Sequence, residues 1–79
     1  MNANAEYRAK YARTLIEKVQ SDHYPSTTHM DLIEATLPDE WVPVYLEVLL
    51  EKVADDHNPS ISMLKRIAAL VERVPAETG

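Results

Sequence analysis

An internal repeat of 34 residues limits the folds open to this chain more than any other feature. Residues 6–37 align without a gap on residues 40–71, and twelve of the 32 aligned pairs are identical. Ordinary residue frequencies would give about two identities. The match is closest between YARTLIEKVQSDHYPS, which starts at Tyr11, and YLEVLLEKVADDHNPS, which starts at Tyr45. The chain is therefore predicted to contain two copies of one structural unit.

The length of the repeat indicates helical hairpins. Periods of about 20 to 50 residues are typical of stacked units that cannot bury an apolar face alone. We expect aligned residues to match in burial, Tyr11 with Tyr45 and Ile33 with Ile67. Tetratricopeptide repeats share this period, but they require a glycine in the first helix of each unit. The only glycine here is Gly79, so the period assigns no family.

Apolar residues at three- and four-residue spacing predict two helices in each repeat and no strand. In the first repeat we expect helices at about 4–20 and 28–37, with Asn4 and Thr28 at their amino ends. The residues predicted to be buried on these two helices are Tyr7, Tyr11, Ala12, Leu15, Ile16 and Val19, followed by Met30, Ile33 and Leu37.

The second repeat contains the most apolar stretch of the chain, Asp39 to Asp56, with ten apolar residues. A helix that is apolar around most of its circumference is normally buried between other helices. This stretch is therefore the predicted core helix, capped by Asp39. A final helix is expected at about 59–74, with Asn58 and Pro59 at its start. The residues predicted to be buried on it are Ile61, Leu64, Ile67, Ala68, Val71 and Val74.

These assignments define an all-α fold of four helices, arranged as two tandem helical hairpins in a small bundle. We expect residues 1–79 to form one domain, with 75–79 as a flexible tail. The sequence has no cysteine, which excludes disulfides, thiolate metal sites and thiol nucleophiles and fits a reducing cytoplasm. No apolar run approaches the roughly 18 residues that span a membrane, and MNANAEYRAK lacks the apolar core of a signal peptide.

The net charge is −5, and the acidic groups concentrate in the middle of the chain. Residues 31–56 hold eight acidic side chains and one lysine, and three of the acidic groups recur one helical turn apart. Paired carboxylates perform acid and base catalysis only in a cleft that separates their pKa values, so a docking strip or a solvated face is favoured. Together with apolar residues of the same helix, this line gives the predicted interaction surface, which comprises Glu47, Glu51, Asp55, Val42, Leu46 and Leu50.

Both repeats contain the loop Asp-His-x-Pro-Ser. Its residues are Asp22, His23, Pro25 and Ser26 in the first repeat, and Asp56, His57, Pro59 and Ser60 in the second. We interpret it as a structural joint, because histidine suits the carboxyl end of a helix, whereas proline and serine suit the start of the next one. A zinc site built from both loops is the lesser hypothesis, because adjacent Asp and His lack the spacing of helical zinc motifs.

The sequence lacks a glycine-rich phosphate loop and a nucleophile elbow, so we expect neither an enzyme nor a cofactor. The leading hypothesis is a small cytoplasmic interaction or regulatory module that presents a helical surface to a protein partner. Two repeats leave uncovered faces, which favours a symmetric dimer or a docking site for that partner. A helix-turn-helix protein that binds nucleic acid is the alternative, although Lys65, Arg66 and Arg73 are few for phosphate contacts.

The interpretation of the loops as joints predicts that folding needs no metal. The thermal midpoint measured by circular dichroism should be the same with and without a chelator, and calorimetry with zinc should show no stoichiometric binding. A large loss of stability on chelation, abolished by His23→Ala and by His57→Ala, would instead support the zinc hypothesis.

Overall fold

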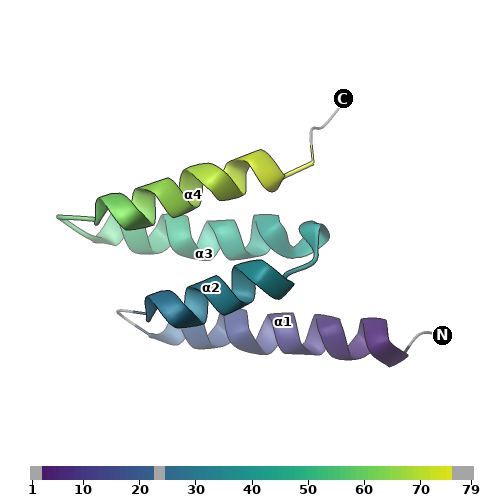
Figure 1. The fold of residues 1–79 in the computed structure, drawn as a ribbon. Coiled ribbons are helices and arrows are strands. Elements are labelled where there is room, and N and C mark those ends of the chain that lie inside the picture. Colours follow the sequence, from purple (N-terminus) through teal and green to yellow (C-terminus); the bar gives the residue numbers. More distant parts are fainter. Residues whose placement is uncertain (1–2, 23–24, 76–79) are drawn as a thin grey trace. The chain divides into compact units, whose positions relative to one another are not determined.

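The computed structural model describes residues 3–22 and 25–75, which form four α-helices and one 3-10 turn, with no strand among them (Figure 1). The predicted all-α class with four helices is confirmed. The elements in chain order are α1 (Ala3–Ser21), α2 (Thr27–Thr36), η1 (Asp39–Trp41), α3 (Val42–Asp55) and α4 (Ile61–Arg73).

The chain divides into two units, residues 1–38 and 39–79. In the first unit α1 packs on α2, and in the second α3 packs on α4 and on the turn η1. Each unit is therefore a helical hairpin. The boundary falls between the predicted repeats 6–37 and 40–71, but common origin of the two hairpins remains a prediction from the sequence alone.

The two hairpins are most alike where their helices are joined. Helix α1 ends at Ser21 and α3 at Asp55, while α2 begins at Thr27 and α4 at Ile61. Both pairs of ends are 34 residues apart, the offset of the repeat. The far ends differ, because α1 has 19 residues against 14 in α3, and α2 has 10 against 13 in α4.

In the first hairpin the shortness of α2 determines which part of α1 is covered. Ten residues extend about 15 Å, whereas the 19 residues of α1 extend about 28 Å, so the first turns of α1 reach beyond α2. Tyr7 and Tyr11 lie on these turns and are exposed, which contradicts their predicted burial. The buried residues of this hairpin are Ala12, Ile16, Val19, Met30, Ile33 and Leu37.

In the second hairpin α4 runs along the whole of α3. The last turn of α4 reaches the turn η1, where Nη2 of Arg73 donates to Oδ1 of Asp39 at 3.1 Å. Tyr45 is fully buried, whereas its repeat mate Tyr11 is 43% exposed, so the predicted match in burial is wrong for this pair. It holds for Ile33 and Ile67, which are both buried.

Helix α3 has one wide apolar face and one exposed face, and its five buried residues are more than any other described helix contributes to the core. Its exposed face includes Val44, Leu50 and the acidic residues Glu47 and Glu51. Its buried residues are Val42, Tyr45, Leu46, Val48 and Leu49.

The amino ends of the helices also differ from those predicted. Asn4 lies inside α1 and Thr28 inside α2, while Asp39 begins η1. The N-cap of α3 is Trp41, whose side chain makes no capping hydrogen bond, and Pro43 follows in the first turn of the helix. Proline suits that turn because the amide that it lacks would have no partner within the helix. Residues 76–79 of the predicted tail lie outside the part of the chain that the structure describes.

Helix α4 presents a different face to the core from the one predicted. Its buried residues are Ile67 and Leu70, and Leu70 was not among the predicted set. The opposite side of the helix is exposed and carries four of the residues predicted to be buried, hereafter the α4 stripe, which consists of Ile61, Leu64, Ala68 and Val71. Apolar side chains occupy both sides of α4, so their spacing could not show which side packs on α3.

Two leucines of α4 test this orientation. Leu70 is 2% exposed and Leu64 is 44% exposed. Leu70→Ala should lower the free energy of unfolding by about 2–5 kcal/mol, because it removes buried methyl groups and leaves a cavity. Leu64→Ala should lower it by less than about 1 kcal/mol. Urea unfolding measures both, and equal losses would contradict the orientation of α4.

Candidate interaction surface

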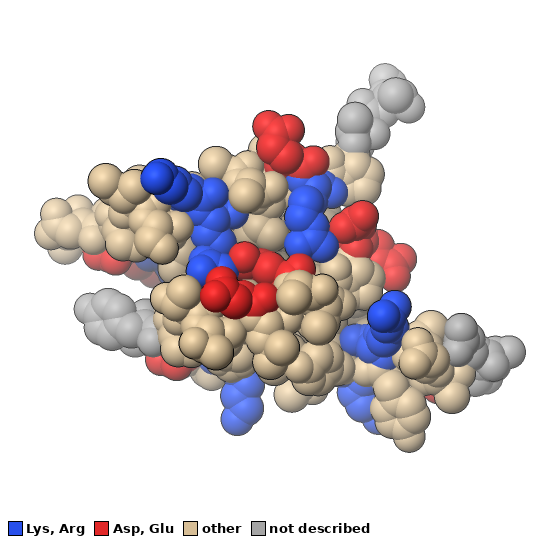
Figure 2. Space-filling model, in the orientation of Figure 1, with Lys and Arg blue, Asp and Glu red and all other residues tan. Residues whose placement is uncertain are grey.

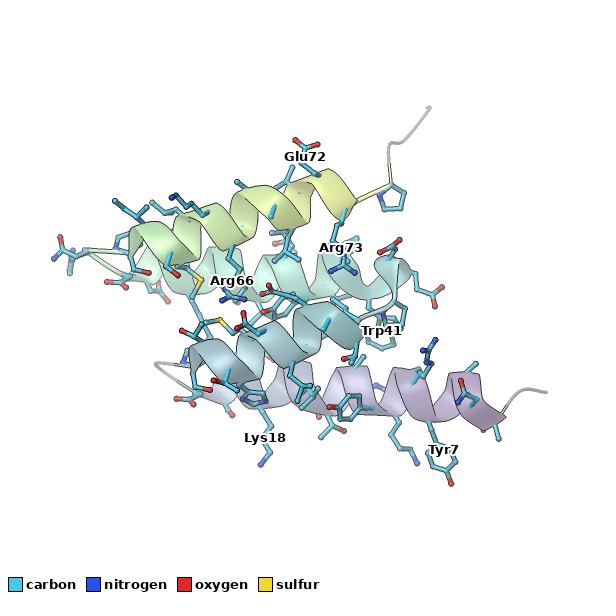
Figure 3. All side chains as sticks on the ribbon, viewed as in Figure 1. Tyr7, Lys18, Trp41, Arg66, Glu72 and Arg73 are labelled. Atoms are coloured by element: carbon cyan, nitrogen blue, oxygen red, sulfur yellow. The ribbon has the colours of Figure 1, made fainter. Side chains whose placement is uncertain are left out.

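The α4 stripe is a single apolar line along one helix. Its residues follow one another at intervals of three, four and three, so they fall on one side of the helix. Ile61 is 71% exposed, Leu64 44% and Val71 52%. Figure 3 shows Arg66 and Arg73 leaving α4 on the side nearer α3 and Glu72 pointing away on the other side. The α4 stripe is therefore available to another molecule.

Two exposed charged residues, Lys65 and Glu72, accompany the α4 stripe. They are seven residues apart, two helical turns, and therefore lie on the same flank of the stripe. The space-filling view shows a basic and an acidic group on the α4 edge of the molecule, with uncharged surface between them (Figure 2). The flank of the stripe thus carries one charge of each sign.

The acidic line on α3 is also on the surface. Glu47, Glu51 and Asp55 are exposed, and Leu50 beside them is 41% exposed. Val42 and Leu46, which the sequence grouped with this line, are buried. Their burial removes these two residues from any surface that the folded chain presents, and leaves an acidic face with one exposed leucine.

The repeated loop forms the same cap in both hairpins. Ser26 is the N-cap of α2, and its Oγ accepts a hydrogen bond from the backbone N–H of His29 at 3.0 Å. Ser60 is the N-cap of α4, and its Oγ accepts from the backbone N–H of Met63 at 3.0 Å. Each bond gives a partner to an amide that the helix itself leaves without one. The predicted cap Asn58 lies two residues too early.

The carboxyl ends of α1 and α3 also match each other. The backbone N–H of Asp22 donates to the carbonyls of Lys18 and Val19, and that of Asp56 donates to the carbonyl of Val53. In the second loop Oδ1 of Asp56 accepts from the backbone N–H of Asn58 at 3.0 Å, which stabilises the turn.

These contacts give the loop residues Asp22, Ser26, Asp56 and Ser60 a part in joining the helices. Pro25 and Pro59 are half-buried next to the caps, and His57 is exposed. His23 lies outside the described residues. Within residues 3–22 and 25–75, no group of three or more histidine or acidic side chains is placed to hold a metal ion.

Two of the three cations named for the nucleic-acid alternative are engaged within the chain. Arg73 pairs with Asp39, and Arg66 is half-buried, whereas Lys65 is exposed. Nonspecific binding to nucleic acid draws on several lysine and arginine contacts to phosphates. The surface of α4 is therefore poorer in free positive charge than its sequence suggests.

No helix in the described part of the chain is long and apolar enough to cross a bilayer. Comparisons with protein-family models, with curated proteins and with solved structures find no match to this chain. The α4 stripe was missed at the level of sequence because its residues resemble a buried face. The signal that could have revealed it is a second apolar line on the same helix, formed by Met63, Ile67, Leu70 and Val74.

The matching caps give a prediction about stability. Ser26→Ala and Ser60→Ala should each lower the free energy of unfolding by about 1 kcal/mol, because each leaves an amide of the first helical turn without its acceptor. Thr28→Ala and Ser62→Ala are matched controls, since these hydroxyls lie inside α2 and α4. Urea unfolding of all four variants measures the difference, and equal effects of caps and controls would contradict the role of the loop.

Proposed function

We propose that this chain is a non-enzymatic interaction module that presents a helical surface to a protein partner, and that the α4 stripe is the contact. The exposure of the stripe is the observation that carries this proposal. Apolar surface in water costs about 25 cal/mol per Å² relative to its burial, so a partner that covers the stripe gains free energy. The composition, free of cysteine, fits a reducing compartment such as the cytoplasm.

The arrangement of the exposed apolar residues on α4 supports the proposed contact more strongly than their number does. Single apolar side chains on a surface are normal, whereas a contiguous apolar patch is typical of an interaction site. Ile61, Leu64 and Val71 recur at the spacing that a helix uses to anchor itself in a groove or on another helix. One side of α4 holds the hairpin together, and the other side is left for a partner.

The acidic face of α3 does not favour catalysis. Glu47 and Glu51 are both exposed on one helix face, so both carboxylates lie in water. Acid and base catalysis requires environments that differ between the two groups. Such a face suits a solvated surface, and the proposed contact does not include it.

A matched pair of leucine variants tests the proposed function. Leu64→Ser alters the α4 stripe, and Leu50→Ser alters a leucine of nearly equal exposure on α3. A tagged chain is used to capture proteins from cells that also express a second copy with a different tag. Wild type and Leu50→Ser should retain the same protein, and Leu64→Ser should bind it about ten- to hundredfold more weakly, as for the loss of an interface anchor.

Retention that is lost equally in both leucine variants, or that is unchanged in both, would contradict the assignment of the contact to the α4 stripe. Thermal melting of each variant accompanies the capture, because both leucines are exposed and their replacement should leave the fold intact.

A further inference from the structure

We infer that the partner of the α4 stripe is α4 of a second copy of this chain, packed antiparallel about a two-fold axis. This inference rests on the proposed function and names its partner. The intervals of three, four and three residues in the stripe are those of the apolar seam between two helices of a coiled coil. Pro75 occupies the next position of the seam, just beyond the end of α4.

In an antiparallel pair, larger side chains of one α4 stripe lie opposite smaller side chains of the other. With the axis level with residue 66, Ile61 lies opposite Val71 of the second copy, and Leu64 lies opposite Ala68 of the second copy. The two-fold axis repeats both contacts, so the same patch serves on both chains. The larger side chains thus meet smaller ones in each layer, which allows the two helices to approach closely.

The charges beside the stripe select this direction. In an antiparallel pair of helices, residues on the same flank of the two seams face each other. Lys65 and Glu72 share one flank, and with the axis level with residue 66, Lys65 of each chain is offset from Glu72 of the other by about 7.5 Å along the helices. Side chains lean towards the amino terminus of their own helix, so these two residues lean towards each other and form two pairs of opposite charge. The two Lys65 side chains start closer to the axis but lean apart. In a parallel pair Lys65 and Glu72 would face the flank that carries Ile67 and Val74, which have no charge to offer.

The helix dipoles favour the same direction. Glu72 lies in the last turn of α4, where the partial negative charge of the helix end disfavours a carboxylate. In the antiparallel pair this carboxylate lies beside the first turns of the second helix, where the dipole is positive. The position of Glu72 is unfavourable for one helix alone and favourable for the pair.

The contact is small. Helix α4 has 13 residues, about 20 Å of helix. Two such helices in contact bury less than the roughly 1,200 Å² that a stable interface needs. The dimer should therefore be weak and depend on concentration.

Sedimentation velocity of the full chain, diluted from about 1 mM to about 10 µM, measures this association. Wild type should shift from one chain's mass of 9.0 kDa towards twice that value as concentration rises. K65E and E72K each replace two attractive pairs with two repulsive ones, and each should weaken the dimer at least about fivefold. The double variant K65E/E72K exchanges the two charges and should restore the dimer to within about twofold of wild type.

Leu64→Ser should abolish the dimer, and Leu50→Ser is the matched control that should keep it. A wild-type chain that stays at one chain's mass at about 1 mM overturns the inference. If the wild type is a monomer but Leu64→Ser still fails to capture a cellular protein that the wild type captures, the proposed function stands without the dimer. If Leu64→Ser captures the same proteins as the wild type, the dimer and the proposed function both fail. Failure of the double variant to recover overturns the antiparallel pairing. A large fall in the melting temperature of Leu64→Ser also overturns it, because the stripe would then be covered within its own chain.

Discussion

The packing of α3 against α4 is the interaction on which the surface of the second hairpin depends. Once Ile67 and Leu70 turn towards the core, the other apolar side of α4 has to face outwards. Tyr45 of α3 is fully buried, whereas the acidic residues Glu47 and Glu51 of the same helix remain in solvent. Because a helix has a fixed periodicity, the orientation of one buried residue of α4 determines which residues are buried along the whole helix. The proposed interaction surface is a direct consequence of that choice.

The repeat is closest in sequence where the structure depends on particular atoms. The caps of α2 and α4 need a hydroxyl at one position, and serine stands there in both hairpins. The apolar positions need only volume and patterning, which several residue types supply. The loop accordingly keeps four of its five residues in both repeats, whereas the buried Ile16 is aligned in sequence with the exposed Leu50.

Charge has a smaller part in holding the second hairpin together than in defining its surface. The ion pair between Arg73 and Asp39 is solvent-exposed and is worth about 0–1 kcal/mol, so it positions η1 against the end of α4 more than it stabilises the hairpin. Each ion pair proposed between Lys65 and Glu72 beside the α4 stripe would be as weak as the pair between Arg73 and Asp39. In a symmetric pair each contact occurs twice, so weak interactions decide the direction of packing while the apolar seam supplies the free energy.

The sequence by itself determined the four helices, the presence of a joining loop in each hairpin and the equal offset of the two loops, although it placed the caps at Thr28 and Asn58 where the structure has Ser26 and Ser60. Helical periodicity, proline and capping hydroxyls act over a few residues, so these features can be predicted locally. Only tertiary structure decided that Leu70 is buried and Leu64 exposed, and that Tyr11 extends beyond α2. An apolar line shows that a side of a helix can be buried, but the length and position of the neighbouring helix decide which line is covered. The α4 stripe could be recognised as a surface for this reason only after α3 and α4 had been placed together.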